Sequence, residues 1–152
     1  MPRTHTHPNV DAFLDMISIS EGTHDRGDDG YNVLVGGALF ASYDDHPRIL
    51  VKIRNDLKST AAGRYQLLSR YFDHYKDLLG LPDFSPAAQD QIAIQQIKES
   101  RGLELVEEGK FEEAVKKCAH IWASLPGAGY GQHENDMGKL IAAYKAAGGE
   151  IT

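Results

Sequence analysis

The stretch "FLDMISISEGTHD" (residues 13–25) contains a conflict between burial and charge. Phe13, Leu14 and Ile17 recur at helical spacing on one apolar stripe, and the next position on that stripe is Glu21. A glycine follows at once, which is typical of a residue that ends a helix. The pattern therefore predicts a helix whose apolar stripe packs against the core and whose last turn places a carboxylate on the buried side.

This position disfavours the charged form of Glu21 in two ways. The exposed carbonyls in the last turn of a helix carry partial negative charge and favour cations over anions. An apolar surrounding also removes the water that stabilises a carboxylate. Both effects predict a raised pKa, which suits a general acid that protonates a departing oxygen near neutral pH. The alternative is a Glu21 side chain that turns out to solvent beyond a frayed helix end.

Length and composition limit the class of protein. The chain has 152 residues, so we expect one domain over residues 1–152, with residues 1–9 as a flexible N-terminal extension. A formal net charge of −6 argues against a general phosphate-binding surface, and no nucleic-acid partner is expected. The single cysteine, Cys118, lies inside an apolar stripe, which favours a buried core thiol over a reactive one.

No segment has the pattern of a targeting or membrane-spanning sequence. The first residues, "MPRTHTHPNVD" (1–11), lack an apolar stretch of signal-peptide length, and no other apolar run approaches a membrane span. We therefore expect no membrane insertion. The chain shows no coiled-coil seam, so a monomer is expected.

The predicted elements are a helix, a short sheet region and then further helices. This order indicates an α+β fold, mostly helical, with one small antiparallel sheet in the N-terminal third. The expected elements are a first helix with Asn9 as its N-cap, strands within residues 31–40 and 48–53, a long helix from Ser59 or Thr60 to Gly80, a helix from Pro86 to Arg101, a helix after Gly109 that reaches Trp122, and a closing helix that ends at Gly148-Gly149.

Several long segments together resemble one known family. They are "AFLDMISISEGT" (12–23), "GYNVLVGGALF" (30–40), "LKSTAAGRYQLLSRYFD" (57–73), "LGLPDFSP" (79–86) and "IWASLPGAGYGQ" (121–132). From about residue 12 to residue 149 the chain is similar to the bacteriophage lambda lysozyme (endolysin) family of peptidoglycan lytic transglycosylases. The resemblance implies a lysozyme-like catalytic domain. It also implies cleavage between N-acetylmuramic acid and N-acetylglucosamine without water, which leaves a 1,6-anhydro ring on the muramyl residue.

The resemblance also implies a set of site residues. The family's single catalytic glutamate ends the first helix in a Ser-Glu-Gly context, which matches Glu21. Gln66, in "AAGRYQLL" (61–68), is placed on the long helix facing the cleft, where its amide would bind the substrate N-acetyl group or orient Glu21. Tyr130, among the glycines of "PGAGYGQ" (126–132), would stack on a sugar or steady the intermediate with its hydroxyl. The alternatives are a solvent-facing glutamine and a packing tyrosine.

No cofactor or metal ion is expected. The histidines of "HTH" (5–7) together with His24 lack zinc-ligand spacing, and "DRGDDG" (25–30) has glycine where a calcium loop needs its second ligand. The expected partner is the glycan strand of bacterial peptidoglycan. The resemblance further implies an enzyme that accumulates in the host cytoplasm and reaches the periplasm and cell wall after a holin opens the membrane.

Two other functions stay open at this point. A hydrolytic muramidase would need a second carboxylate, for which the chain offers Asp25, Asp28 and Asp29, and later Asp44 and Asp45. The ordinary interpretation of these aspartates is that they solvate two loops. The other possibility is a non-catalytic wall-binding protein that keeps the cleft without the chemistry.

Overall fold

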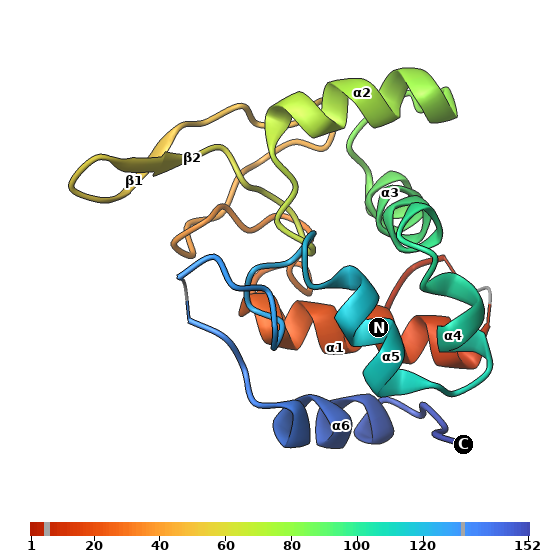
Figure 1. Cartoon of the computed structure of the whole chain (residues 1–152). Coiled ribbons are helices and arrows are strands. Elements are labelled where there is room, and N and C mark those ends of the chain that lie inside the picture. Colours follow the sequence, from red (N-terminus) through yellow and green to blue (C-terminus); the bar gives the residue numbers. More distant parts are fainter. Residues whose placement is uncertain (5–6, 132) are drawn as a thin grey trace.

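The computed structural model describes residues 1–4, 7–131 and 133–152 (Figure 1). Within them the elements follow the order α1 (Pro8–Glu21), β1 (Val51–Arg54), β2 (Leu57–Ser59), α2 (Ser69–Leu79), α3 (Pro86–Glu99), α4 (Leu103–Glu107), α5 (Phe111–Cys118) and α6 (Met137–Ala146). The fold is α+β and mostly helical, as predicted. In the described part of the chain, every helix is too short or too polar to cross a bilayer.

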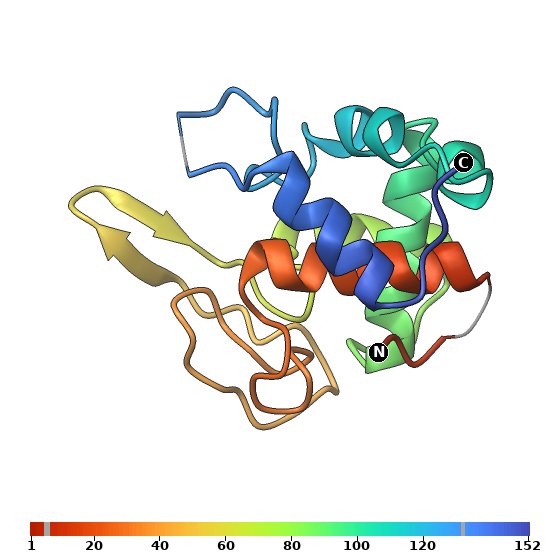
Figure 2. The same cartoon turned by 90° about the horizontal axis from the view of Figure 1, so that it is seen from below.

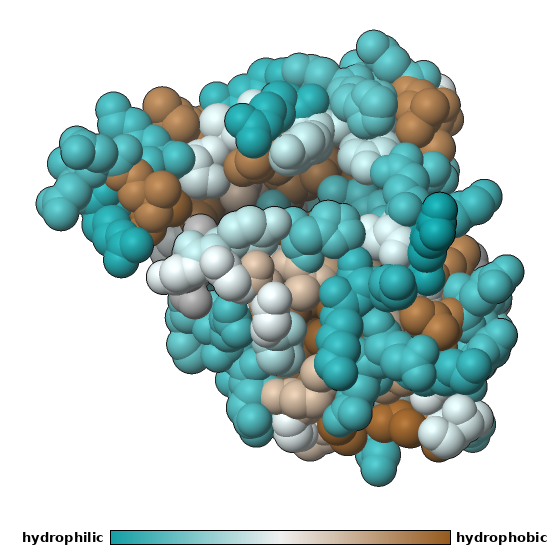
Figure 3. All heavy atoms as spheres, in the orientation of Figure 1, coloured by the Kyte–Doolittle hydropathy of each residue, from teal (hydrophilic) through white to brown (hydrophobic). Residues whose placement is uncertain are grey.

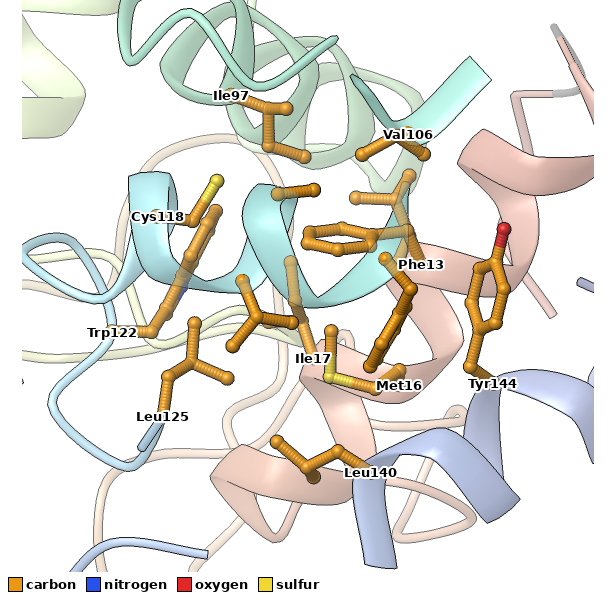
Figure 4. Packing of buried hydrophobic residues seen from close by; sticks show 14 of the residues in the cluster. Phe13, Met16, Ile17, Ile97, Val106, Cys118, Trp122, Leu125, Leu140 and Tyr144 are labelled. Carbon is orange, nitrogen blue, oxygen red and sulfur yellow. The ribbon is translucent and has the colours of Figure 1, made fainter. Parts of the chain in front are cut away.

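Helix α1 is the centre of the larger apolar cluster because it is buried on nearly every side. Helix α6 packs against it (Figure 2), and side chains from α3, α4 and α5 complete the cluster (Figure 4). The rings of Phe13 and Phe111 meet edge to face with centroids 5.8 Å apart. Cys118 is fully buried in this cluster, as predicted. Burial raises the pKa of its thiol to about 12, so the thiol stays protonated at neutral pH.

A second apolar cluster lies beneath α2. Its buried members are Leu34, Phe40, Ala62, Leu67, Phe72, Tyr75, Leu81, Phe84, Ala88 and Ile92. Helix α3 belongs to both clusters, since Ala88 and Ile92 pack in this one and Ala93 and Ile97 pack around α1. The two halves of the molecule are therefore joined through α3.

The sheet is one antiparallel hairpin that projects from the helical body (Figure 1). The strand predicted within 48–53 begins only at Val51. The strand predicted at 31–40 is wrong, because that segment makes only isolated bridges between turns. Gly36 and Gly37 both have positive φ, 89° and 104°, so the extended backbone needed for a continuous ladder breaks there.

The long helix predicted from Ser59 or Thr60 begins instead at Ser69. Before it lies a tight turn, in which Ala62 and Leu67 exchange backbone hydrogen bonds of 3.1 and 2.9 Å. Gly63 and Gln66 have positive φ, 87° and 55°, which a right-handed helix does not allow. A Cβ on Gly63 would lie 2.4 Å from Gln89 Oε1 of α3, so a contact distant in sequence selects this turn over the helix.

The remaining helices follow the predictions with smaller differences. Ser85 caps α3 as expected, with its hydroxyl accepting from the Ala88 amide, and α6 ends shortly before Gly148. Short α4 was not predicted. The predicted helix through Trp122 ends at Cys118, and Trp122 lies in the following turn.

The start of α1 also differs from the prediction. The N-cap is His7, whose Nδ1 accepts a hydrogen bond from the Asn9 amide at 3.0 Å, whereas Asn9 lies inside the first turn. Residues 8 and 9 are thus helical rather than part of an extension. Before them, the amides of Arg3 and Thr4 donate to the buried Asp90, so this part of the N-terminal segment contacts the body.

Candidate active site

Glu21 lies where the sequence placed it, as the last residue of α1 and partly buried. Gly22 follows with φ 79°, and its amide closes the helix by donating to the carbonyls of Ser18 and Ile19. Burial raises the pKa of Glu21 to about 7, and a hydrogen bond from Ser124 partly opposes this. The side chain is therefore poised to give and take a proton near neutral pH.

Three polar residues that the sequence analysis missed form a hydrogen-bonded chain that ends at this carboxylate. Ser124 Oγ donates to Glu21 Oε2 at 3.1 Å and lies 2.7 Å from Ser20 Oγ. Asn135 Nδ2 donates in turn to Ser20 Oγ at 2.9 Å. Ser20 and Ser124 are both within quoted motifs, but they are 104 positions apart in the chain. No local pattern signals that they meet.

Gln66 does not lie on a helix, contrary to the prediction. It occupies the last position of the tight turn before α2, and its Nε2 donates to the carbonyls of Gly63 at 2.9 Å and Val33 at 3.3 Å. Among the described residues, its Oε1 has no hydrogen-bond partner. The turn thus fixes the amide and leaves its acceptor free for an N–H donor such as an acetamido group.

A cavity of about 290 Å³ opens beside this turn, and Figure 3 shows the surface hollowed below α2. Its lining is rich in aromatic and hydrogen-bonding side chains, as a sugar-binding site requires. The lining residues are Tyr65, Gln66, Leu67, Leu68, Tyr71, Tyr75, Gln96, Glu99, Ser100, His120, Ile121 and Trp122.

Hydrogen bonds connect the turn of Gln66 to the surroundings of Glu21. Thr23, two residues after Glu21, donates through Oγ1 to the Arg64 carbonyl at 2.6 Å. Trp122, two residues before Ser124, donates through Nε1 to the Tyr65 carbonyl at 3.0 Å. These bonds tie the turn to the segments on either side of the carboxylate, which is not itself among the residues that line the cavity.

Tyr130 lies in the glycine-rich loop after α5 with 55% of its surface exposed. Its hydroxyl donates to the His120 carbonyl at 3.0 Å, and His120 lines the cavity. The hydroxyl therefore has a partner within the protein, while the ring stays exposed near the cavity rim. This arrangement suits stacking on a sugar better than hydroxyl assistance to an intermediate.

Three of the five aspartates considered as a second catalytic carboxylate are bound by other groups. Tyr43 and Arg3 hydrogen-bond to Asp28 and lower its pKa. Asp29 accepts from the N-terminal amine at 2.6 Å, and Asp45 pairs with the Arg48 guanidinium at 2.9 Å. Among the described residues, Glu21 shares no hydrogen bond with any of these aspartates.

One group of side chains has the composition of a metal site. His24, Asp25 and Asp29 place one ligand atom each within 4.8 Å of one another. However, Asp29 already bonds to the N-terminal amine and to the Asp25 amide, and His24 Nδ1 lies 3.1 Å from Ser18 Oγ. His5 and Thr6 of the "HTH" stretch lie outside the described residues.

Comparison with known proteins gives consistent matches. The Endolysin family model matches residues 11–151. The chain is 55% identical to the endolysin of Escherichia phage lambda over 145 residues, covering 92% of this chain and 91% of that protein. It is 46% identical to the endolysin of Escherichia phage P2 over 162 residues, covering 98% of each.

Solved structures match as closely. A structure of bacteriophage lambda lysozyme complexed with a chitohexasaccharide superimposes with a TM-score of 0.95 at 51% identity. Another structure of lysozyme from bacteriophage lambda gives a TM-score of 0.91 at 50% identity. Each alignment covers 98% of this chain and 99% of the other.

Proposed function

The chain belongs to the endolysin family, and from this premise we propose that it is a lytic transglycosylase that cleaves peptidoglycan between N-acetylmuramic acid and N-acetylglucosamine. As a member of the family it is a phage endolysin that degrades the bacterial cell wall. The proposal concerns the chemistry of cleavage, that is, whether water or the substrate's own C6 hydroxyl attacks C1 of the muramyl residue.

The observation that carries the proposal is the isolation of Glu21 as a carboxylate. It lies partly buried at a helix end with a pKa raised to about 7, and its hydrogen bond comes from a serine hydroxyl. A hydrolase on a lysozyme-like fold needs a second carboxylate at a defined separation, as nucleophile or as base for water. Asp28 is bound by Arg3 and Tyr43, and Asp29 is bound by the N-terminal amine. The side chain of Asp25 is 84% exposed and lies 3.5 Å from His24.

A single carboxylate suffices when the nucleophile belongs to the substrate. Glu21 would donate its proton to the glycosidic oxygen while the C1–O bond breaks, and the N-acetyl group of the muramyl residue would stabilise the cation. The muramyl C6 hydroxyl then attacks C1, and its proton returns to Glu21. The products are a free N-acetylglucosamine 4-hydroxyl and a 1,6-anhydromuramyl end, with no water consumed.

The cavity supports a glycan substrate. A relative with a TM-score of 0.95 to this chain was solved with a chitohexasaccharide, a strand of N-acetylglucosamine units. In our proposal, the glycan occupies the cavity below α2, Gln66 Oε1 accepts the N–H of an acetamido group, and the exposed ring of Tyr130 stacks on a sugar face.

A mass spectrum of the soluble fragments released from purified peptidoglycan tests the chemistry. We expect muramyl ends lighter by one water than ordinary reducing ends. Digestion in water enriched in ¹⁸O is the matched control, because transglycosylation incorporates no solvent oxygen. Reducing ends carrying ¹⁸O would show that water attacks, and the function would become that of a hydrolytic muramidase.

Three variants separate the roles of Gln66 and Tyr130. Gln66→Glu should raise the dissociation constant for a chitooligosaccharide by about tenfold, because the carboxylate keeps an acceptor but loses the Nε2 hydrogen bonds to backbone carbonyls that hold it in place. Tyr130→Phe, which keeps the ring, should bind nearly as the wild type does, whereas Tyr130→Ala should weaken binding by about tenfold. Calorimetric titration measures both. Equal losses for the Phe and Ala variants would assign the role to the hydroxyl instead.

We also propose the route of the enzyme. The chain would accumulate as a monomer in the host cytoplasm and reach the wall once a holin opens the membrane. Release of activity from intact host cells only after holin expression, with analytical ultracentrifugation for the oligomeric state, tests this route.

A further inference from the structure

A chain of hydrogen bonds leads from the far end of the glycine-rich loop to the catalytic carboxylate. Asn135 Nδ2 donates to Ser20 Oγ at 2.9 Å, Ser20 Oγ lies 2.7 Å from Ser124 Oγ, and Ser124 Oγ donates to Glu21 Oε2 at 3.1 Å. Asn135 and Ser20 are buried, at 7% and 8% exposure. Their hydrogen bonds are therefore largely shielded from competing water.

When Glu21 is ionised, the donors available fix the direction of every bond in this chain. A hydroxyl carries one proton, so Ser124, which gives its proton to Glu21, can only accept from Ser20. Ser20 then donates to Ser124 and accepts from Asn135. The orientation of the Asn135 amide follows from its other contacts, since Nδ2 also donates to the Ser20 carbonyl at 3.0 Å and Oδ1 accepts from Lys139 at 3.4 Å. All donors thus point toward the carboxylate.

We propose that Asn135, Ser20 and Ser124 form a positioning relay that holds Glu21 Oε2 and stabilises its charged form, which leaves Oε1 free to exchange the proton with substrate. The inference rests on the proposed function, in which Glu21 acts first as acid and then as base. Such a residue must give up and regain its proton in each turnover. Burial alone favours the protonated form of Glu21, and the hydrogen bond from Ser124 opposes this effect by stabilising the charged form.

The relay also fixes the base of the loop. The backbone amide of Asn135 donates to the backbone carbonyl of Ser124 at 2.7 Å, so the two ends of the loop 124–135 are joined directly beside Glu21. Three other charged or titratable side chains on the segments around Glu21 also have hydrogen-bond partners. His24 contacts Ser18, Glu134 accepts from the amides of Gly127 and Gly129, and Lys139 donates to the relay itself.

The test is a pH titration of the Glu21 carboxyl carbon by NMR in protein labelled with ¹³C-glutamate, assigned with Glu21→Gln. Ser124→Ala removes the donor and should raise the midpoint by about one pH unit, because the hydrogen bond from the hydroxyl favours the charged form of the carboxyl group. Ser124→Thr, which keeps the hydroxyl, should restore the midpoint. The alkaline limb of kcat should move with it while KM stays nearly constant.

Ser20→Ala distinguishes a relay from a single hydrogen bond. Ser20 does not bond to Glu21, so a smaller shift in the same direction is expected only if the bonds act in series. Glu134→Gln is the matched control, because it weakens the hold on the loop amides of Gly127 and Gly129 and should leave the Glu21 midpoint unchanged.

An unchanged midpoint in both Ser124→Ala and Ser20→Ala would overturn the proposal, as would equal shifts in the Glu134→Gln control. Dispersed NMR spectra establish that each variant is folded, and Ser20→Ala gives an answer if Ser124→Ala does not fold. The titration needs no substrate. If the serine variants shift the midpoint but the enzyme releases ordinary reducing ends, the relay therefore stands and only the proposed function is revised.

Discussion

Glu21→Gln should lower kcat on purified peptidoglycan by about 10²–10⁴-fold, the range found for removal of a general acid–base group. The amide keeps the size of the side chain and can still accept from Ser124, so binding of a chitooligosaccharide should remain. Loss of turbidity of a wall suspension measures the rate. A rate within a few fold of the wild type would exclude Glu21 as the acid, and loss of binding would indicate a damaged fold instead.

The same substitution should stabilise the protein at alkaline pH. The pKa of Glu21 in the folded state is about 7, above its ordinary value of 4.5, because burial favours the neutral form. The folded state therefore holds this proton more tightly than the unfolded chain, and stability falls as pH rises through 7. Above pH 8 the neutral variant should exceed the wild type by up to about 3 kcal/mol, and below pH 4.5 the two should agree.

Glu107→Gln is the matched control, since Glu107 is also the last residue of a helix, α4, but is exposed. It should change neither the rate nor the pH dependence of stability. Urea unfolding from pH 4 to 9 follows the free energy of all three proteins. Parallel curves for wild type and Glu21→Gln would show that burial does not raise the pKa as described. Activity of the wild type should fall as pH rises above 7, because the acid form is lost.

The conflict between burial and charge at Glu21 could be predicted from the sequence, because the features that indicate burial and those that indicate a helix end are both local. The apolar stripe, the helix end and the following glycine lie within ten residues, and α1 forms as that pattern predicts. The turn before α2 could not be predicted from the sequence. Tyr65 and Leu68 continue the apolar spacing of Phe72 and Tyr75, so the sequence alone favours a helix. Gln89 of α3 overrides it by binding the Arg64 amide and closely approaching Gly63.

The hydrogen-bond partners of the site residues could not be predicted from the sequence for a related reason. Ser20, Ser124 and Asn135 are ordinary polar residues in their own segments, and each has a role only because the fold brings α1 and the two ends of the loop together. The motif "AAGRYQLL" pointed to Gln66 but not to what holds it. Backbone carbonyls hold its amide, and the turn that carries it is anchored to α1 by the side chain of Arg64, the largest fully buried side chain in the described part of the chain.

Arg64→Met should destabilise the protein by about 3–5 kcal/mol, the cost of breaking a buried ion pair from one side. Arg64 is 0% exposed and donates to Asp15 at 2.5 Å, to the Asp29 carbonyl at 3.0 Å and to the Tyr65 hydroxyl at 3.1 Å. Burial by itself would lower the pKa of the guanidinium, but Tyr65 and Asp15 raise it above its ordinary value. Methionine fills part of the space and leaves the buried Asp15 with the N-terminal amine, 3.3 Å away, as its remaining cationic partner.

Arg48→Met supplies the matched comparison, because Arg48 also pairs with two aspartates, Asp45 and Asp73, but at the surface. Water screens that pair, so its loss should cost less than about 1 kcal/mol. The double variant Arg64→Met with Asp15→Asn should recover part of the lost stability, since it removes a buried charge that has lost its guanidinium partner. Similar urea midpoints for Arg64→Met and Arg48→Met would contradict the buried network. Because Arg64 also anchors the turn that carries Gln66, folded Arg64→Met should bind chitooligosaccharides more weakly than the wild type, whereas Arg48→Met should not.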